Sequence, residues 1–124
     1  MSKGIHHVGL AVQSVDEMAS FLEELFGAKM TDYKMETPEF FSRMVTIGNG
    51  IFERLEPRGQ DGLIEKFLEK RGEGIHHVSM MVDNLDEVLS YCKEKNMTLM
   101  GNRFIHPKSA HGVLIELIDA KEMK

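Results

Sequence analysis

The pentapeptide GIHHV occurs twice in this chain, at residues 4–8 and again at residues 74–78. The match extends further, because GIHHVGLAVQSVDE (4–17) and GIHHVSMMVDNLDE (74–87) share the glycine, the isoleucine, both histidines, two valines and the closing Asp-Glu pair. A repeat of this kind indicates two copies of one supersecondary unit that cannot bury its hydrophobic face alone. The chain is therefore expected to fold as two similar halves that complete each other.

The first copy carries the signals of a strand, a helix and three further strands. Residues 5–12 are an apolar run typical of a strand. Ser14 and Glu17 have the spacing of a capping box, and Gly27 ends the helical periodicity that follows them. The pattern and a turn at residues 48–50 then predict strands near 29–36, 40–47 and 50–56.

The second copy repeats these signals. Residues 75–82 predict the strand, Asn84 and Glu87 repeat the capping box, and the helix is expected to end at Lys95-Asn96. Three more strands are predicted near 97–100, 103–106 and 112–118.

A connecting helix is predicted over residues 62–71, with Asp61 as its cap and Gly72 as its stop. We therefore predict an α+β fold in which two βαβββ modules in tandem, at about 4–57 and 74–119, form one curved eight-stranded sheet around a cleft. The length of 124 residues suits a single domain that spans the whole chain.

Composition excludes several classes of protein. A net charge of −5 gives no support to a nucleic-acid partner, which needs a basic surface. No apolar run approaches the ~20 residues of a membrane span, and the start of the chain has no hydrophobic signal region, so we expect a cytoplasmic protein. Cys92 is the only cysteine; we expect it to pack in a helix rather than to act as a nucleophile.

Alternation along a strand separates the two histidines of each copy. His6 and His76 share their faces with large apolar residues, which suits packing under a helix. His7 and His77 share theirs with small residues, which leave room for another group. The second histidine of each pair is therefore the better candidate for a ligand.

Each copy also ends in a strand that carries a candidate carboxylate among apolar residues, Glu53 in the first and Glu116 in the second. Burying a carboxylate is costly unless its charge is compensated. Two imidazoles and two carboxylates would balance a divalent cation such as cobalt, nickel, manganese, zinc or iron. The alternative is that the glutamates lie on solvated faces and the histidines are core residues. Recurrence of the pair in both halves favours the metal.

A βαβββ repeat with histidine on each first strand and glutamate on each last strand resembles the vicinal oxygen chelate superfamily. This superfamily includes glyoxalase I, extradiol dioxygenases, bleomycin-resistance proteins and the methylmalonyl-CoA epimerases, and the chain is most similar to the epimerases. The resemblance covers nearly the whole chain. Its segments are GIHHVGLAV (4–12), ERLEP (53–57), KFLEKRGEGIHHV (66–78), VDNLDEV (82–88) and HPKSAHGVLIEL (106–117).

The resemblance implies a metal-dependent epimerase that interconverts the 2R and 2S forms of methylmalonyl-CoA, or a related acyl-CoA, through a metal-stabilised enolate. One divalent ion, with cobalt favoured, would lie in the cleft. Glu116 would also be the catalytic base, and the HPKS turn would help to hold the anionic substrate. The implied metal ligands are His7, Glu53, His77 and Glu116, and the implied substrate-binding residues are Lys108 and Ser109.

Other readings stay open at this point. The chain could be a glyoxalase I-like isomerase (a lactoylglutathione lyase), another metal enzyme such as an oxygenase, or a metal-free binding protein of the same fold. Some relatives carry a second carboxylate where this chain has Met44, so Glu39 and a water are both candidates for a second base. Only Gly-Asn-Arg separates Met100 from Phe104, where epimerases usually have a longer loop, and this leaves the exact substrate open.

The sequence also predicts that two copies of the chain associate. Two half-sheets leave edges and apolar surface to cover, and members of the superfamily commonly dimerise. We expect a homodimer with a small-molecule substrate and with neither nucleic acid nor membrane as a partner.

Overall fold

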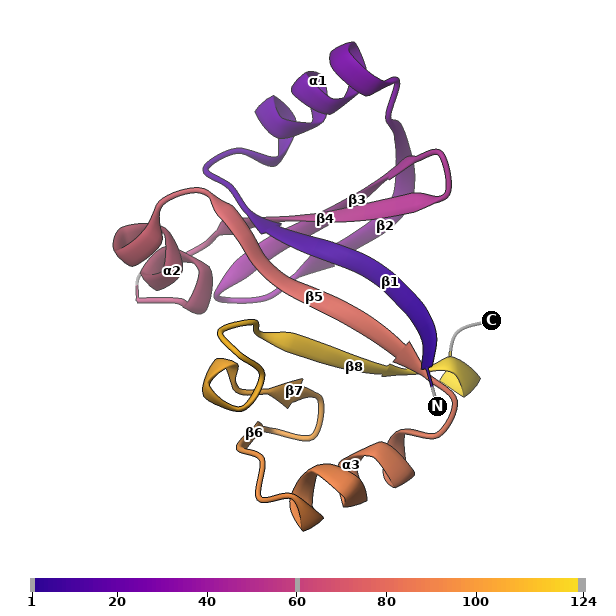
Figure 1. Ribbon diagram of the computed structural model, residues 1–124. Coiled ribbons are helices and arrows are strands. Elements are labelled where there is room, and N and C mark those ends of the chain that lie inside the picture. The colour runs from indigo at the N-terminus through magenta and orange to yellow at the C-terminus, as the bar shows by residue number, and fades with distance from the viewer. Residues whose placement is uncertain (1, 60, 123–124) are drawn as a thin grey trace. The chain divides into compact units, whose positions relative to one another are not determined.

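The computed structural model describes residues 2–59 and 61–122 (Figure 1). Its elements repeat the order β-α-β-β-β, as predicted, with one helix between the two copies. The first copy consists of β1 (Ser2–Ala11), α1 (Val15–Phe26), β2 (Lys29–Glu36), β3 (Phe40–Ile47) and β4 (Gly50–Pro57), and the connecting helix is α2 (Leu63–Arg71). The second copy consists of β5 (Gly74–Val82), α3 (Leu85–Glu94), β6 (Leu99–Met100), β7 (Phe104–Ile105) and β8 (Ile115–Asp119).

The eight strands form one sheet with the order β2-β3-β4-β1-β5-β8-β7-β6. In each copy the first and last strands are parallel neighbours, β1 beside β4 and β5 beside β8. The remaining strands join this pair as antiparallel hairpins. This topology confirms the predicted α+β class, and it places each strand that carries a glutamate directly beside one that carries histidines.

The described residues divide into two compact units. One unit runs from Val8 to His76, and the other contains the residues up to His7 together with those from His77 onward. The start of β1 therefore packs with the second copy of the repeat rather than with the first. The prediction of a single domain over the whole chain stays a prediction.

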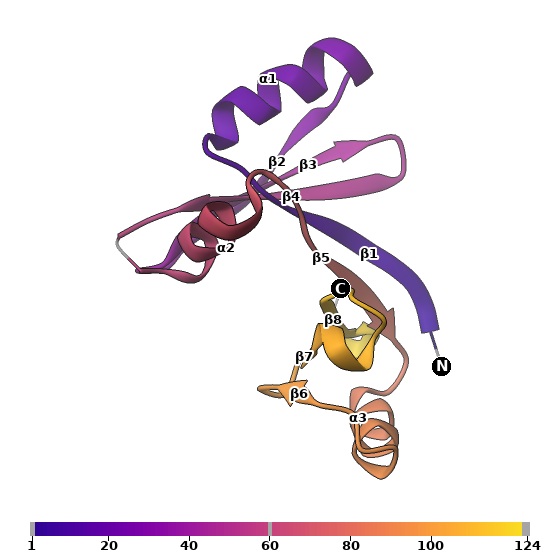
Figure 2. The ribbon, with the colours of Figure 1, turned by 60° about the vertical axis from the view of Figure 1, so that its left-hand side comes forward.

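In the unit from Val8 to His76, α1 and α2 cover opposite faces of the sheet (Figure 2). Leu22 of α1 packs with Val45 and Phe52, whereas Ile64 of α2 packs with Leu55. Phe52 and Leu55 lie on opposite faces of β4, as alternation requires. Both faces of β4 are thus packed in this unit, one by α1 and the other by α2.

Polar side chains from β4 hold the first turn of α1. The Glu56 carboxylate accepts a hydrogen bond from the Val15 N–H at 2.9 Å, and the Arg54 guanidinium donates to the Val15 carbonyl at 2.6 Å. Burial lowers the pKa of Arg54, and the charge of Arg43 lowers it further. Hydrogen bonds therefore fix the approach of the helix to the sheet.

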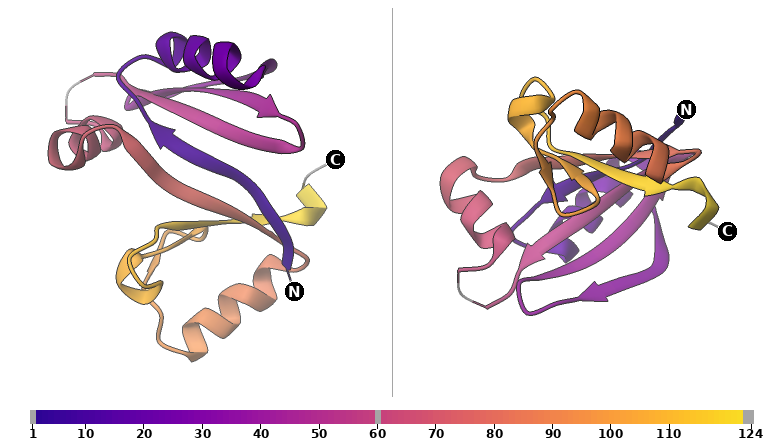
Figure 3. Two further views of the ribbon diagram at one scale, coloured as in Figure 1. Left: turned by 45° about the horizontal axis from the view of Figure 1, so that its top comes forward. Right: turned by 90° about the horizontal axis from the view of Figure 1, so that it is seen from below.

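In the other unit, α3 packs alongside β8 (Figure 3). Leu85 of α3 forms a buried cluster with Val82 and Leu117, which lie on the strand face opposite to Glu116. Cys92 is buried on the same helix, and burial raises the pKa of its thiol, in keeping with the predicted packing role. Within residues 2–59 and 61–122, no helix is long and apolar enough to cross a membrane.

The predicted helix caps are largely confirmed. Ser14 accepts a hydrogen bond from the Glu17 N–H at 3.1 Å, and Asn84 accepts one from the Glu87 N–H at 3.2 Å. Gly27 has a φ of 69°, a left-handed conformation that favours glycine at the end of a helix.

Two predictions of local structure were wrong. Asp61 does not cap α2, because the cap is Gly62 and the Asp61 N–H instead donates to the Glu65 carboxylate at 3.1 Å. The last three strands are shorter than expected, since β6 and β7 have two residues each and β8 begins only at Ile115. A 3₁₀ helix at residues 107–109 follows β7, in keeping with Pro107, which lacks the N–H that a strand ladder needs.

Candidate metal centre

The second histidine of each GIHHV copy is buried, as alternation predicts. His7 on β1 has 4% of its surface exposed, and His77 on β5 has 5%. The preceding His76 is only partly buried, and its ring lies edge-on to Phe67 at 5.0 Å between centroids. The two histidines of β5 therefore point to different faces, and His77 is the one aimed away from this packing.

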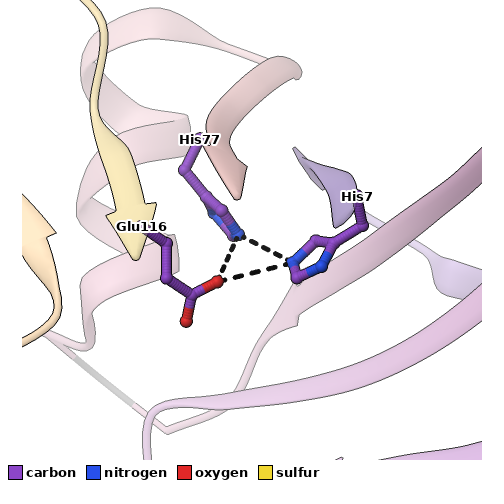
Figure 4. A group of neighbouring side chains, drawn as sticks. All are labelled: His7, His77 and Glu116. Atoms are coloured by element: carbon purple, nitrogen blue, oxygen red, sulfur yellow. Dashed lines mark hydrogen bonds and ion pairs between the residues drawn. The ribbon is translucent and has the colours of Figure 1, made fainter. Parts of the chain in front are cut away.

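Glu116 reaches the two buried histidines from β8 (Figure 4). In the parallel register of β5 and β8 it stands opposite Ser79, two residues beyond His77 on the same strand face. The Nε2 atoms of His7 and His77 are 3.3 Å apart, and each lies near Oε1 of Glu116, at 3.5 and 3.7 Å respectively. The side chain of Glu116 is 26% exposed, so the cluster is open to solvent on the carboxylate side.

This triangle of atoms fits a divalent cation. First-row ions hold nitrogen and oxygen ligands at about 2.0–2.2 Å, so two ligands at angles between a right angle and the tetrahedral angle lie about 2.8–3.6 Å apart. The separations of 3.3 and 3.5 Å lie in the upper part of that range, and the separation of 3.7 Å lies just above it. Two imidazoles and one carboxylate are also the donor types that such ions prefer. The residues present therefore suit the predicted metal.

Two further residues contact the cluster. The hydroxyl of Ser79, whose residue is completely buried, donates to Oε1 of Glu116 and lies 2.8 Å from Nε2 of His7. On the other side of the His7 ring, Nδ1 lies 2.7 Å from Nδ1 of His6. The contact at Nδ1 fixes the orientation of an imidazole that binds a metal through Nε2.

Glu53 belongs to the other compact unit, which runs from Val8 to His76. It is 7% exposed on β4, and its carboxylate accepts a hydrogen bond from Ser42 at 2.6 Å. Met44, where a second carboxylate was sought, is its register partner on β3. The sequence identified Glu53 as a buried carboxylate, but it gave no sign that Ser42 would hold it.

The predicted substrate-binding residues lie on the 3₁₀ turn before β8. Lys108 is exposed, and its N–H donates to Nδ1 of His106 at 3.0 Å. The Ser109 hydroxyl oxygen accepts from the Thr98 N–H at 2.9 Å, which ties the turn to the start of the preceding hairpin. Among the described residues the turn does not join the histidine–glutamate cluster.

Two buried serines beside the candidate carboxylates, Ser79 and Ser42, were not predicted from the sequence. The repeat offers one signal, because Ser79 stands where the first copy has Gly9. A hydroxyl added beside a buried carboxylate would be expected to bond with it, but only the strand register shows that Glu116 lies opposite.

Known proteins resemble this chain in sequence and in fold. The model of the Glyoxalase/Bleomycin resistance protein/Dioxygenase superfamily matches residues 6–118. The mitochondrial methylmalonyl-CoA epimerase of Homo sapiens is 31% identical, over 94% of this chain and 73% of the human protein. The ethylmalonyl-CoA/methylmalonyl-CoA epimerase of Cereibacter sphaeroides is 28% identical, over 91% of this chain and 95% of that protein.

Solved structures show the same fold. A methylmalonyl-CoA epimerase from Mycobacterium tuberculosis superimposes with a TM-score of 0.84 at 26% identity, covering 95% of this chain and 88% of its own. A methylmalonyl-CoA epimerase in complex with methylmalonyl-CoA and NH4+ gives a TM-score of 0.86 at 25% identity, covering 96% and 95% respectively. The resemblance inferred from the sequence is thus confirmed. The chain belongs to the Glyoxalase/Bleomycin resistance protein/Dioxygenase superfamily.

Proposed function

We propose that this protein is a metal-dependent epimerase that interconverts the 2R and 2S forms of methylmalonyl-CoA or of a closely related acyl-CoA. The observation that carries the proposal is the convergence of His7, His77 and Glu116, contributed by both copies of the repeat. Several of its relatives are epimerases of that substrate class, which supports an isomerase. Cobalt is the favoured ion, and nickel, manganese, zinc and iron are the other candidates.

Epimerisation requires removal of the proton between a thioester and a carboxylate, followed by its return to the opposite face. A bound cation would supply Lewis-acid stabilisation of the negative charge that develops on the thioester oxygen. His7 and His77 would hold the ion through Nε2; both rings are buried, and His6 contacts the His7 ring at Nδ1. Glu116 would take the proton, since its carboxylate is the partly exposed member of the cluster.

Glu53 is proposed as the fourth ligand by analogy between the two copies. It stands opposite Gly9 in the β1–β4 register, and Glu116 stands opposite Ser79 in the β5–β8 register. Gly9 and Ser79 are equivalent positions of the repeat, each two residues after the buried histidine of its copy. The two glutamates are therefore equivalent in register as well as in sequence.

Lys108 and Ser109 are proposed to help hold the anionic substrate. Lys108 is an exposed cation on a turn that Ser109 ties down by a hydrogen bond. An exposed lysine on an anchored turn suits a phosphate or carboxylate group, because the ammonium stays hydrated until the substrate binds. We also propose a cytoplasmic location and a single domain over the whole chain.

The function predicts metal-dependent proton exchange at the substrate's α-carbon. Chelator-treated protein is expected to bind one equivalent of Co²⁺ and then to wash deuterium into methylmalonyl-CoA from deuterated water. The measurements are calorimetric titration with the metal and mass analysis of the recovered thioester. Stoichiometric metal with no exchange, but with turnover of the glutathione hemithioacetal of methylglyoxal, would indicate a glyoxalase I-like isomerase. Absence of metal binding would indicate a metal-free binding protein.

We further propose a homodimer and predict a solution mass of two chains at micromolar concentration. The support is an apolar surface on α1, where Phe21, Leu25 and Phe26 are 53%, 61% and 56% exposed. It continues into a pocket of about 350 Å³ that is lined by Phe26, Ile47, Gly50, Ile51 and Phe52. Patches of this kind on small proteins usually mark an interface. Light scattering coupled to gel filtration measures the mass, and a single-chain mass would contradict the dimer.

A further inference from the structure

Ser79 is completely buried and lies between two of the proposed metal ligands. Its hydroxyl donates to Oε1 of Glu116, and its oxygen lies 2.8 Å from Nε2 of His7. A hydroxyl has one proton and two acceptor lone pairs. Because that proton goes to the carboxylate, the contact with His7 requires the imidazole to donate from Nε2 in the metal-free protein.

The strand can form without a hydroxyl at the position of Ser79. The equivalent residue of the first copy is Gly9, which has no side chain, although both strands are flanked in parallel by the glutamate strand of their copy. The first copy obtains a similar bond from elsewhere, since Ser42 on β3 donates to the Glu53 carboxylate at 2.6 Å. Each proposed carboxylate ligand therefore accepts a hydrogen bond from a serine that is 0% exposed.

We propose that Ser79 is a positioning residue that holds Glu116 and His7 in place for the metal. Before metal binding it connects the two ligands, one from each copy of the repeat, and so limits their rotamers. For Nε2 of His7 to bind an ion, its lone pair must face the ion. The ring proton then belongs on Nδ1, where Nδ1 of His6 lies 2.7 Å away as an acceptor. Ser79 keeps its bond to one lone pair of Oε1 of Glu116, and the second lone pair of that oxygen stays available to the ion.

The inference rests on the proposed metal site, and its test uses metal binding itself as the readout. We expect Ser79→Ala to bind Co²⁺ about 10- to 100-fold more weakly than the wild type, the range typical of losing a hydrogen-bond partner behind a ligand. The visible absorption bands of bound Co²⁺ are expected to shift, because the freed Glu116 carboxylate can adopt other coordination modes. Ser79→Thr keeps the hydroxyl and is expected to stay within a few-fold of the wild type.

The matched control is Ser90→Ala, which removes an exposed hydroxyl from α3 of the same unit and should change neither quantity. Thermal unfolding of the metal-free proteins shows which variants fold. If Ser79→Ala does not fold, Ser79→Gly reproduces the residue of the first copy and takes its place. Unchanged cobalt affinity and spectrum in a folded variant without the hydroxyl would overturn the positioning role alone. Equal losses in Ser79→Thr and Ser79→Ala would also overturn it. A wild-type protein that binds no cobalt would instead overturn the proposed metal site, and this inference with it.

Discussion

Glu116→Gln is expected to slow α-proton exchange by the ~10²–10⁴-fold that is typical of losing a general base. Glutamine keeps the length of the side chain and one oxygen that can accept the Ser79 hydrogen bond. It removes the negative charge and nearly all of the basicity, so metal affinity should fall only modestly. The measurement is deuterium wash-in at the α-carbon of methylmalonyl-CoA under saturating cobalt.

The control for this substitution is Glu94→Gln, which changes an exposed glutamate at the end of α3. This variant should catalyse α-proton exchange at the wild-type rate. Saturation must be checked by titration, because a weakly loaded variant would mimic a lost base. A fully loaded Glu116→Gln that retains near-wild-type exchange would show that Glu116 is a ligand only. The base would then be sought in the first copy, starting from Glu39, which is exposed on the turn between β2 and β3.

The second large effect concerns the histidine pair of β5. His77→Ala is expected to weaken cobalt binding by more than about 100-fold, because a direct ligand contributes more than the partners behind it. His76→Ala should leave the affinity nearly unchanged and lower the free energy of unfolding instead. The His76 ring packs against Phe67, so the substitution removes a packing contact and lowers the stability of the fold.

Calorimetric titration with Co²⁺ and thermal unfolding of both variants separate these outcomes. The two residues are sequence neighbours of the same type, so each serves as the control for the other. Equal losses of affinity would contradict the assignment of His77 to the metal face. A large loss in His76→Ala without a change in stability would reverse the assignment.

The repeated GIHHV segment and its surrounding pattern determined much of this protein. Alternation separated His77 from His76, because successive residues of a strand must point to opposite faces whatever the strand packs against. Helix caps at Ser14 and Asn84 were readable for a similar reason, since a side chain that bonds to a backbone N–H three residues away acts locally. Glu116 was conspicuous as the single charge within an apolar run, and Glu53 was its counterpart in the first copy.

Properties that depend on distant neighbours needed the structure. Aspartate is a residue type that commonly caps helices, yet the backbone of Asp61 has a φ of 61°, and Gly62 takes the cap position. The lengths of β6, β7 and β8 depend on which backbone groups find a partner strand, and residues 107–109 turn away instead.

The candidate site likewise combines features that the sequence predicts with features that depend on strand pairing. The residue types and their positions within each strand followed from the sequence, because they depend on local alternation and on the cost of an unpaired charge. The register that sets Glu116 opposite Ser79, and the meeting of His7 with His77, depend on how strands distant in sequence pair. A serine carries no periodic signal of its own. Its role as a hydrogen-bond donor was decided only when tertiary pairing brought a buried carboxylate within reach.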